Sequence, residues 1–158
     1  MITKHTALAL ALAVTASLTA CNDSNTTSNM ADSNPTTADV ASRQTLMKDW
    51  RSAHDTLRAM TDNPASFDVA TTKEQTQFLV DSSAKMWQHF SDSAAKGQAS
   101  ETIWSDPTAF QAATDEYNAA VLALNAAAQT ATTPADIEVA LARVNESCGS
   151  CHKSFRVR

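Results

Sequence analysis

Near the C-terminus of the chain stands a cluster of side chains that can do chemistry, Cys148-Gly149-Ser150-Cys151-His152. This C-x-x-C-H spacing is the attachment signature of c-type haem. On a helix, residues three and four apart share one face, so Cys148, Cys151 and His152 lie together. The two thiols can then join the two vinyl groups of a haem while the imidazole of His152 binds the iron. One covalently bound haem c is therefore the expected cofactor.

Three other kinds of site contain two cysteines beside a histidine. A thioredoxin-like redox motif opens a helix after a strand, whereas this motif closes a predicted helix. A zinc site needs four ligands, and only His54 and His89 remain as further candidates. A structural disulfide between Cys148 and Cys151 is compatible with an exported protein. Haem attachment is the interpretation that agrees best with the rest of the sequence.

The N-terminal segment has the pattern of an export signal. Lys4 precedes an apolar run over residues 7–18, which suits a signal peptide and is too short to span a bilayer. The run ends in Leu18-Thr19-Ala20-Cys21, which resembles the lipobox of bacterial lipoproteins. That resemblance implies that residues 1–20 are removed and that Cys21 is lipidated. Ordinary cleavage after Ala20, which leaves a free cysteine, is the alternative.

Residues 22–38 are polar and rich in turn-forming side chains, with no apolar period. Such a segment buries too little apolar surface to offset the entropy of ordering it. We therefore predict a lipidated flexible tether over residues 21–38 and one domain over residues 39–158. Two or more acyl chains anchor a protein stably, so the sequence predicts a membrane-anchored lipoprotein of the periplasm.

The composition favours an all-α fold. The 158 residues carry 12 Lys and Arg against 17 Asp and Glu, a formal net charge of −5, which argues against a partner made of nucleic acid. Only two glycines are present, too few for the turns of an all-β fold or for a Gly-rich phosphate loop.

Four segments of the domain carry helical periodicity, which predicts an antiparallel four-helix bundle. The first runs over about residues 39–60, where Asp39 can cap its start. The second covers roughly residues 72–95, with Gly97 just past its end. The third begins at Asp106-Pro107 and continues through residue 128. The fourth starts at Thr133-Pro134-Ala135-Asp136, an approximate capping box, and contains the C-x-x-C-H motif.

A haem motif at the end of a four-helix chain resembles the class II cytochromes c, particularly the cytochrome c′ family. Four segments are similar to family motifs in order and spacing: Arg43–Met47, Trp87–Phe90, Ile103–Asp106 and His152–Arg156. One departure is the short connection Lys96–Ser100, where relatives often have a longer loop. The shape of the haem-edge rim therefore does not follow from the resemblance.

The resemblance assigns roles to three residues of the first helix. Arg43 falls on the inward stripe of that helix, where an unpaired charge is costly; the resemblance implies that it faces a haem propionate, and Gln44 is a candidate for the same neighbourhood. From its spacing alone, Met47 is a core residue. By resemblance it lies over the distal haem face, where it either blocks access or ligates the iron.

The aromatic residues and the C-terminus have simpler interpretations. Trp87, Phe90 and Phe155 are most simply core residues, and a haem would share their packing as an apolar partner. Arg156 lies one turn after His152; the family resemblance implies that it guards the proximal haem face, and it also complements the dipole at the helix C-terminus.

Two functions follow from the resemblance. In the first, five-coordinate high-spin iron binds nitric oxide or carbon monoxide, and the protein is also capable of electron transfer. In the second, Met47 ligates and the protein is a low-spin His/Met electron carrier whose redox partner is unknown. No acid/base pair is placed over the distal face, so we expect no enzyme. Homodimers are common in the family, with contacts through the first two helices.

Overall fold

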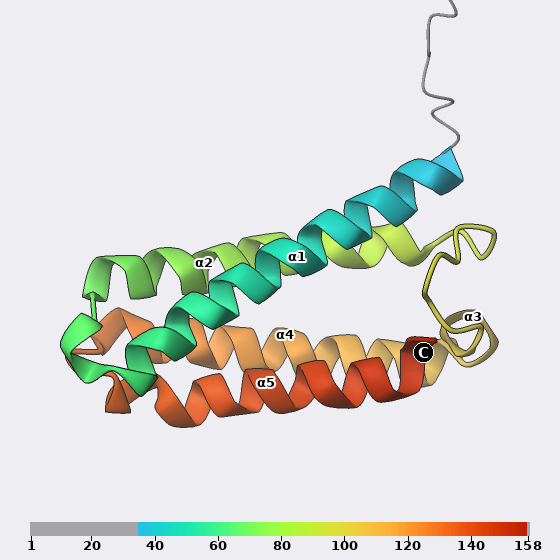
Figure 1. The fold of residues 1–158 in the computed structure, drawn as a ribbon. Helices are drawn as coiled ribbons and strands as arrows, with labels where there is room; N and C mark the ends of the chain where they lie inside the picture. The colour runs from blue at the N-terminus through green and yellow to red at the C-terminus, as the bar shows by residue number, and fades with distance from the viewer. Residues whose placement is uncertain (1–34, 158) are drawn as a thin grey trace, which may run out of the picture. The chain divides into compact units, whose positions relative to one another are not determined.

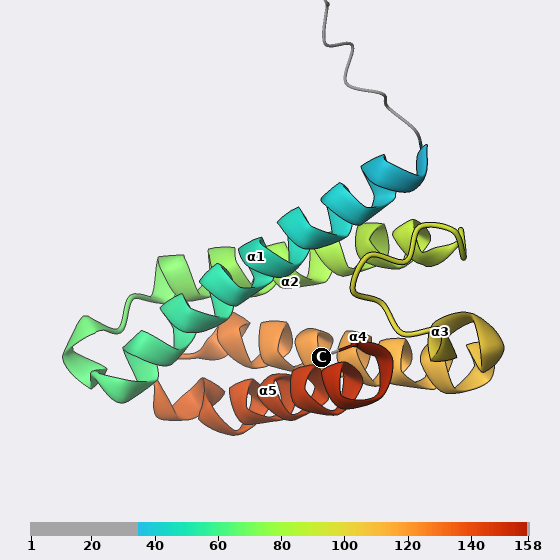
Figure 2. The same ribbon diagram turned by 45° about the vertical axis from the view of Figure 1, so that its right-hand side comes forward.

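The computed structural model describes residues 35–157, and the predicted signal peptide and Cys21 lie outside them. Four long helices form an antiparallel bundle: α1 (Pro35–Asp62), α2 (Val69–Met86), α4 (Pro107–Thr130) and α5 (Ala135–Phe155). Short helical turns η1 (Pro64–Ser66), η2 (Trp87–Phe90) and α3 (Thr102–Ser105) lie in the connections. Figures 1 and 2 show two layers, with α1 and α2 over α4 and α5. The predicted all-α four-helix bundle is thus confirmed.

Side-chain caps explain where the later helices begin. The Asp68 carboxylate accepts the Thr71 backbone N–H at 2.7 Å, and the Asp106 carboxylate accepts that of Ala109 at 3.0 Å. Pro107 follows Asp106 at the first helical turn, as predicted. In the first turn of α5, the Asp136 carboxylate accepts hydrogen bonds from the backbone N–H groups of Thr132 and Thr133. These are the hydrogen bonds that the acidic residue of the expected capping box makes.

The predicted start of the first helix and its predicted cap were wrong. α1 begins at Pro35, so residues 35–38 of the predicted tether are helical. Proline suits the first turn of a helix because its missing N–H has no partner there. Asp39 therefore does not cap the helix, and its carboxylate instead contacts Nδ1 of His89 at 2.8 Å.

The second helix also differs from its prediction at both ends. It begins at Val69 rather than at residue 72, because Asp68 supplies the cap. Its α-helical part ends at Met86, and the tighter turn η2 carries the chain only to Phe90 rather than to residue 95. Asp92 then accepts the backbone N–H of Ala94, which turns the chain away from the helix axis.

Gly97 allows the connection after η2 to approach α1 closely. Its φ is +54°, a conformation that side chains disfavour. A Cβ at this position would lie 2.9 Å from Cγ1 of Val40. A glycine is therefore required for contact with α1 here, rather than as the end of a helix.

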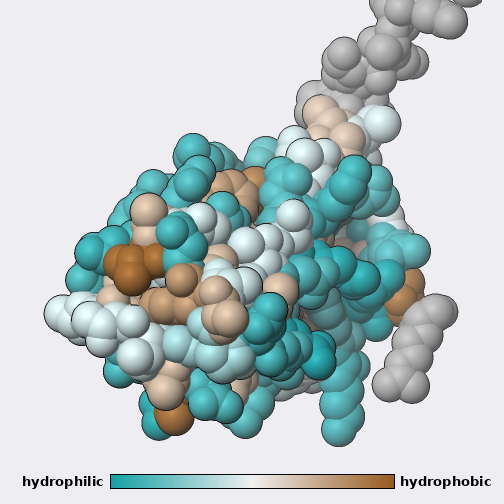
Figure 3. All heavy atoms as spheres, turned by 60° about the vertical axis from the view of Figure 1, so that its left-hand side comes forward, coloured by the Kyte–Doolittle hydropathy of each residue, from teal (hydrophilic) through white to brown (hydrophobic). Residues whose placement is uncertain are grey.

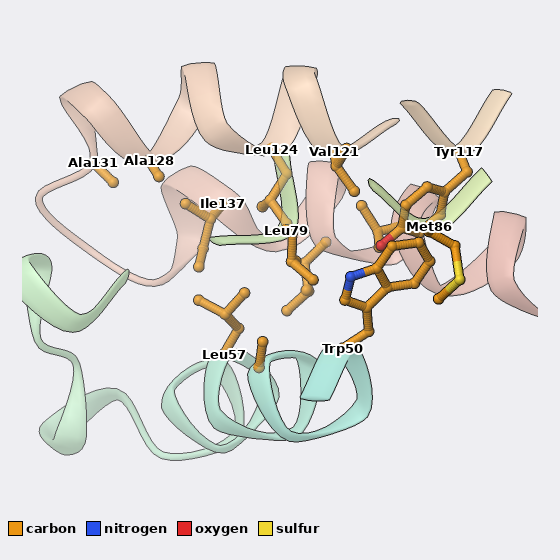
Figure 4. Packing of buried hydrophobic residues seen from close by; sticks show 13 residues of the cluster. Trp50, Leu57, Leu79, Met86, Tyr117, Val121, Leu124, Ala128, Ala131 and Ile137 are labelled. Atoms are coloured by element: carbon orange, nitrogen blue, oxygen red, sulfur yellow. The ribbon is translucent and has the colours of Figure 1, made fainter. Parts of the chain in front are cut away.

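The hydrophobic core occupies the centre of the bundle. Trp50 stacks on Tyr117 with ring centroids 4.5 Å apart, and its indole N–H donates to Ser82 Oγ at 2.8 Å. Figure 4 shows apolar side chains from all four long helices packed beside this stack, and those that are fully buried include Leu57, Leu79, Leu124 and Ile137.

The outer surface is mainly hydrophilic in the view of Figure 3, with a few hydrophobic side chains toward its left part. The large apolar side chains that are exposed are Val69, Leu122, Val139 and Val157. None of the helices among the described residues has the length and hydropathy needed to cross a membrane. Contact between two copies through α1 and α2 stays a prediction.

Candidate functional site

A cavity of about 830 Å³ opens at the end of the bundle where α5 finishes. Figures 1 and 2 show that α1 diverges from α5 toward the N-terminal end of α1. The volume falls within the range of roughly 300–1,000 Å³ typical of sites for small molecules and cofactors. All the site residues predicted within the described chain line this cavity: Arg43, Gln44, Met47, Trp87, Phe90, Cys148, Cys151, His152, Phe155 and Arg156.

The C-x-x-C-H motif forms the last turns of α5. Cys148 and Cys151 are half-buried and not disulfide-bonded. Burial raises the pKa of the Cys148 thiol, and burial, Cys148 and Glu116 together raise the pKa of Cys151 to about 11. Both side chains are therefore protonated thiols at neutral pH.

His152 is exposed at the cavity and can offer a free imidazole nitrogen. Its pKa is lowered by partial burial, by Arg156 and by Arg51 of α1. The imidazole is consequently neutral at pH 7, which is the protonation state that binds a metal ion. Arg51 was not identified from the sequence, because only the fold brings α1 near the end of α5.

Arg43 is buried in the cavity wall with part of its hydrogen-bonding capacity unused. Nη2 donates to the carbonyl oxygens of Ala95 and Lys96, and the guanidinium carbon lies 4.6 Å from the centroid of the Phe90 ring. Within residues 35–157, Nη1 is buried and has no hydrogen-bond partner. Burial lowers the pKa of Arg43, and the nearby Asp39 opposes this.

The other two predicted residues of α1 line the same cavity. Met47 is half-buried, one turn after Arg43, and presents the only thioether that lines the described cavity. Gln44 is exposed at the cavity edge. Neither position is part of the fully buried core, so both side chains remain available to a bound group.

Aromatic rings form much of the apolar wall. Phe90 and Phe110 lie 5.1 Å apart between ring centroids, and Phe110 and Phe155 lie 5.4 Å apart. Trp87 packs edge-on against Tyr117 at 5.7 Å, and its indole N–H donates to Asn118 at 3.0 Å. Phe110 and Tyr117 lie on α4, and their place in the lining depends on how α4 packs against the other helices.

The short connection over residues 96–100 closes one side of the cavity. Its backbone pairs with the last residue of α5 and with the segment that follows, where Ser100 N–H donates to Phe155 O at 2.9 Å and Val157 N–H donates to Gln98 O at 3.0 Å. The Arg156 guanidinium also donates to the Gln98 side-chain oxygen at 2.9 Å. Because these two segments are far apart in the sequence, no local pattern of residues predicts that they pair.

The other two histidines of the described chain, His54 and His89, are separated by the fold. His54 lines the cavity, with Nδ1 3.7 Å from the Asp55 carboxylate, whereas His89 pairs with Asp39 outside the lining. In the described part of the chain, no three His, Cys, Asp or Glu side chains are grouped to hold a metal ion.

The lining fits a covalently held haem. An aromatic wall suits the porphyrin faces, and two thiols with a neutral imidazole on one helix match its attachment points. The unpaired Nη1 of Arg43 suits a propionate, because a buried guanidinium N–H without a partner is costly. The donor set is therefore complete within this cavity.

Comparison with known proteins supports this fit over the whole domain. The sequence model of the cytochrome c′ family matches residues 38–156. Cytochrome c′ of Rubrivivax gelatinosus is 32% identical over 103 residues, which cover 63% of this chain and 79% of that protein.

Solved structures agree with the sequence comparison. The crystal structure of Rubrivivax gelatinosus cytochrome c′ superposes with a TM-score of 0.71 at 27% identity, covering 77% of this chain and 97% of that one. A ferrous variant of Alcaligenes xylosoxidans cytochrome c′ with bound nitric oxide gives 0.71 at 25% identity, covering 76% and 94%. Members of this family carry one covalently bound c-type haem. With the family match spanning the bundle and its C-terminal motif, the chain belongs to the cytochrome c′ family.

Proposed function

We propose that the protein binds nitric oxide and carbon monoxide at a five-coordinate haem iron ligated by His152, and that it can also transfer electrons. The haem supplies an iron that takes a diatomic gas when ferrous and exchanges one electron with a partner. The observation that carries the proposal is that the C-x-x-C-H residues of α5 and Met47 of α1 line one cavity. The nitric oxide complex of an Alcaligenes xylosoxidans relative supports it.

The residues that line the cavity have different roles in the proposed function. Cys148 and Cys151 hold the haem, and His152 is oriented toward it by the same helical face. Arg43 offers its unpaired N–H to a propionate. Met47 narrows the space on the α1 side with an apolar thioether that donates no hydrogen bond, which disfavours dioxygen relative to nitric oxide. Such a protein would buffer or trap nitric oxide rather than act as an enzyme.

A second candidate is a low-spin electron carrier in which Met47 ligates the iron. The observation that favours it is the same thioether, half-buried in the cavity lining. A small shift of α1 along its axis is enough to decide whether Met47 blocks access to the iron or ligates it. Spectroscopy therefore has to distinguish the two functions.

The visible and electron paramagnetic resonance spectra of the ferric and ferrous protein, with and without carbon monoxide, test the proposal directly. We expect a high-spin spectrum that shifts when carbon monoxide is added, because Met47 blocks the site without ligating it. A low-spin spectrum unmoved by carbon monoxide would establish the electron carrier instead. Protein without haem would contradict both functions.

Met47→Ala measures what this side chain does. We expect the iron to remain high-spin and the carbon monoxide affinity to rise by roughly tenfold, about 1.4 kcal/mol, as the obstacle is removed. Leu46→Ala is the matched control, since Leu46 packs against the core and does not line the cavity. A change from low-spin to high-spin iron in Met47→Ala would instead identify a ligand.

Arg43→Met tests the proposed contact with a haem carboxylate by removing the charge while keeping most of the volume. A buried cation near the haem favours the added electron, so its loss should lower the reduction potential by roughly tens of millivolts. The potential is measured by spectroelectrochemistry. Arg143→Met is the control, because Arg143 is exposed and outside the cavity lining; an equal shift in both variants would reject the contact.

We further propose that the protein is exported to the periplasm and held at the membrane by a lipid on Cys21. The support is the apolar run over residues 7–18 followed by the lipobox-like Leu18-Thr19-Ala20-Cys21. Mass spectrometry of the mature N-terminus checks this. We expect a chain that begins at Cys21 with the mass of its acyl groups added, and an unmodified cysteine would contradict the anchor.

A further inference from the structure

Charge is distributed unevenly between the cavity and the rest of the molecule. Residues 35–157 contain ten Lys and Arg and fifteen Asp and Glu. Of these, Asp55 is the one carboxylate that lines the cavity. Six cations line it, namely Arg43, Lys48, Arg51, Arg58, Lys96 and Arg156. The cavity is therefore positive in a domain whose other surfaces are strongly negative.

Three of these six cations already have a role within the protein. Arg43 is buried and donates to backbone carbonyls. Arg58 pairs with Asp62 at 3.4 Å, and Lys96 pairs with Glu101. The charges of Arg58 and Lys96 are paired with carboxylates of the fold, and Arg43 is buried and assigned to the haem propionate, so none of the three presents an unpaired charge at the surface.

The other three are exposed at the mouth of the cavity. Lys48 and Arg51 lie one turn apart on α1 and form no ion pair with any described residue. Arg156, just past the end of α5, is held by the neutral side chain of Gln98 and keeps its full charge. We call Lys48, Arg51 and Arg156 the cationic rim. It combines residues of α1 with a residue just past the C-terminal end of α5, all of which line the cavity.

We propose that the cationic rim docks an acidic redox protein against the mouth of the haem cavity. This proposal rests on the electron-transfer part of the proposed function. Charges of one sign around a cleft steer an oppositely charged partner into it and raise the association rate even when the protein as a whole has the wrong sign of net charge. The cationic rim therefore attracts an acidic partner to the mouth of the cavity, although the net charges of the two proteins repel each other.

An anionic lipid surface carries the same sign of charge as an acidic protein, but it fits the cationic rim less well. Lipid recognition typically uses clusters of about four to eight basic residues, whereas the rim has three. A phospholipid also supplies no electron. The rim lies at the entrance of the cavity that fits the haem, which is where an electron donor or acceptor has to approach.

Two small oxidants of equal and opposite charge can measure the local field in the ferrous haem-loaded protein. Each trianionic hexacyanoferrate(III) takes one electron and becomes hexacyanoferrate(II), while the haem iron passes from iron(II) to iron(III). Tricationic tris(phenanthroline)cobalt(III) takes one electron in the same way and becomes cobalt(II). Stopped-flow rates are recorded for both reagents from low to high ionic strength.

We expect the rate constant with the anion to fall as salt is added, and that with the cation to rise, despite the net charge of −5. In Lys48→Gln/Arg51→Gln, the anion should react roughly threefold to tenfold more slowly at low salt. Lys85→Gln/Arg143→Gln is the matched control, because it removes one exposed Lys and one exposed Arg outside the cavity lining. An equal loss in the control would overturn the proposal.

A binding measurement that requires no electron transfer completes the test. Decaglutamate is titrated into the haem-loaded protein, and amide chemical shifts are followed by NMR. We expect salt-dependent shifts around residues 48–51 and 156 that are lost in Lys48→Gln/Arg51→Gln and kept in the control pair. No shifts at the rim, or binding to phosphatidylglycerol vesicles without binding to the peptide, would reject the docking site. Either result leaves the gas-binding spectra unaffected, so the two proposals fail separately.

Discussion

Trp50 and Tyr117 stack where the packed core of the bundle meets the cavity, because both residues belong to the core and also line the cavity. Both rings are buried, lie 4.5 Å apart and also line the cavity. The Trp50 indole donates to Ser82 on α2, which holds the ring in one orientation. A cavity of about 830 Å³ would tend to collapse in a bundle without such a floor, because interiors pack densely. The rest of the site depends on this boundary.

The buried guanidinium of Arg43 illustrates how a binding site differs from a core. Its Nη2 holds the carbonyls of the connection after η2, while Nη1 is left without a partner in the described chain. In a purely structural position such a group is unfavourable, because an unpaired buried donor costs free energy. The cost is offset when an anionic group binds, so the same residue contributes to the fold and to the cofactor site.

In the proposed functions, the chemistry of the cavity and its charge serve different partners. A small uncharged gas would reach the interior past apolar side chains such as Met47, and charge would have little effect on it. A protein partner would be too large to enter and would meet only the entrance, where the cationic rim lies. A single cavity can thus combine selectivity for a ligand at its interior with selectivity for a partner at its mouth.

Local signals in the sequence were sufficient for the bundle and for its attachment motif. Helical periodicity and the caps at Asp106 and Thr133–Asp136 predicted α4 and α5 closely, because these interactions involve neighbouring residues. The C-x-x-C-H motif is likewise contained in one turn and a half of helix. Errors arose where a signal was overlooked or where tertiary contacts decide, as at Asp68 before α2 and in the turn η2.

The sequence by itself determined the fold class, the attachment motif for the haem and, through family resemblance, the residues of α1 that line the cavity. Only the tertiary structure decided how the cavity is enclosed and charged. The pairing of residues 96–100 with the C-terminus and the approach of Arg51 to His152 join segments that are far apart along the chain. Such contacts depend on how the helices cross, which no local pattern of residues encodes.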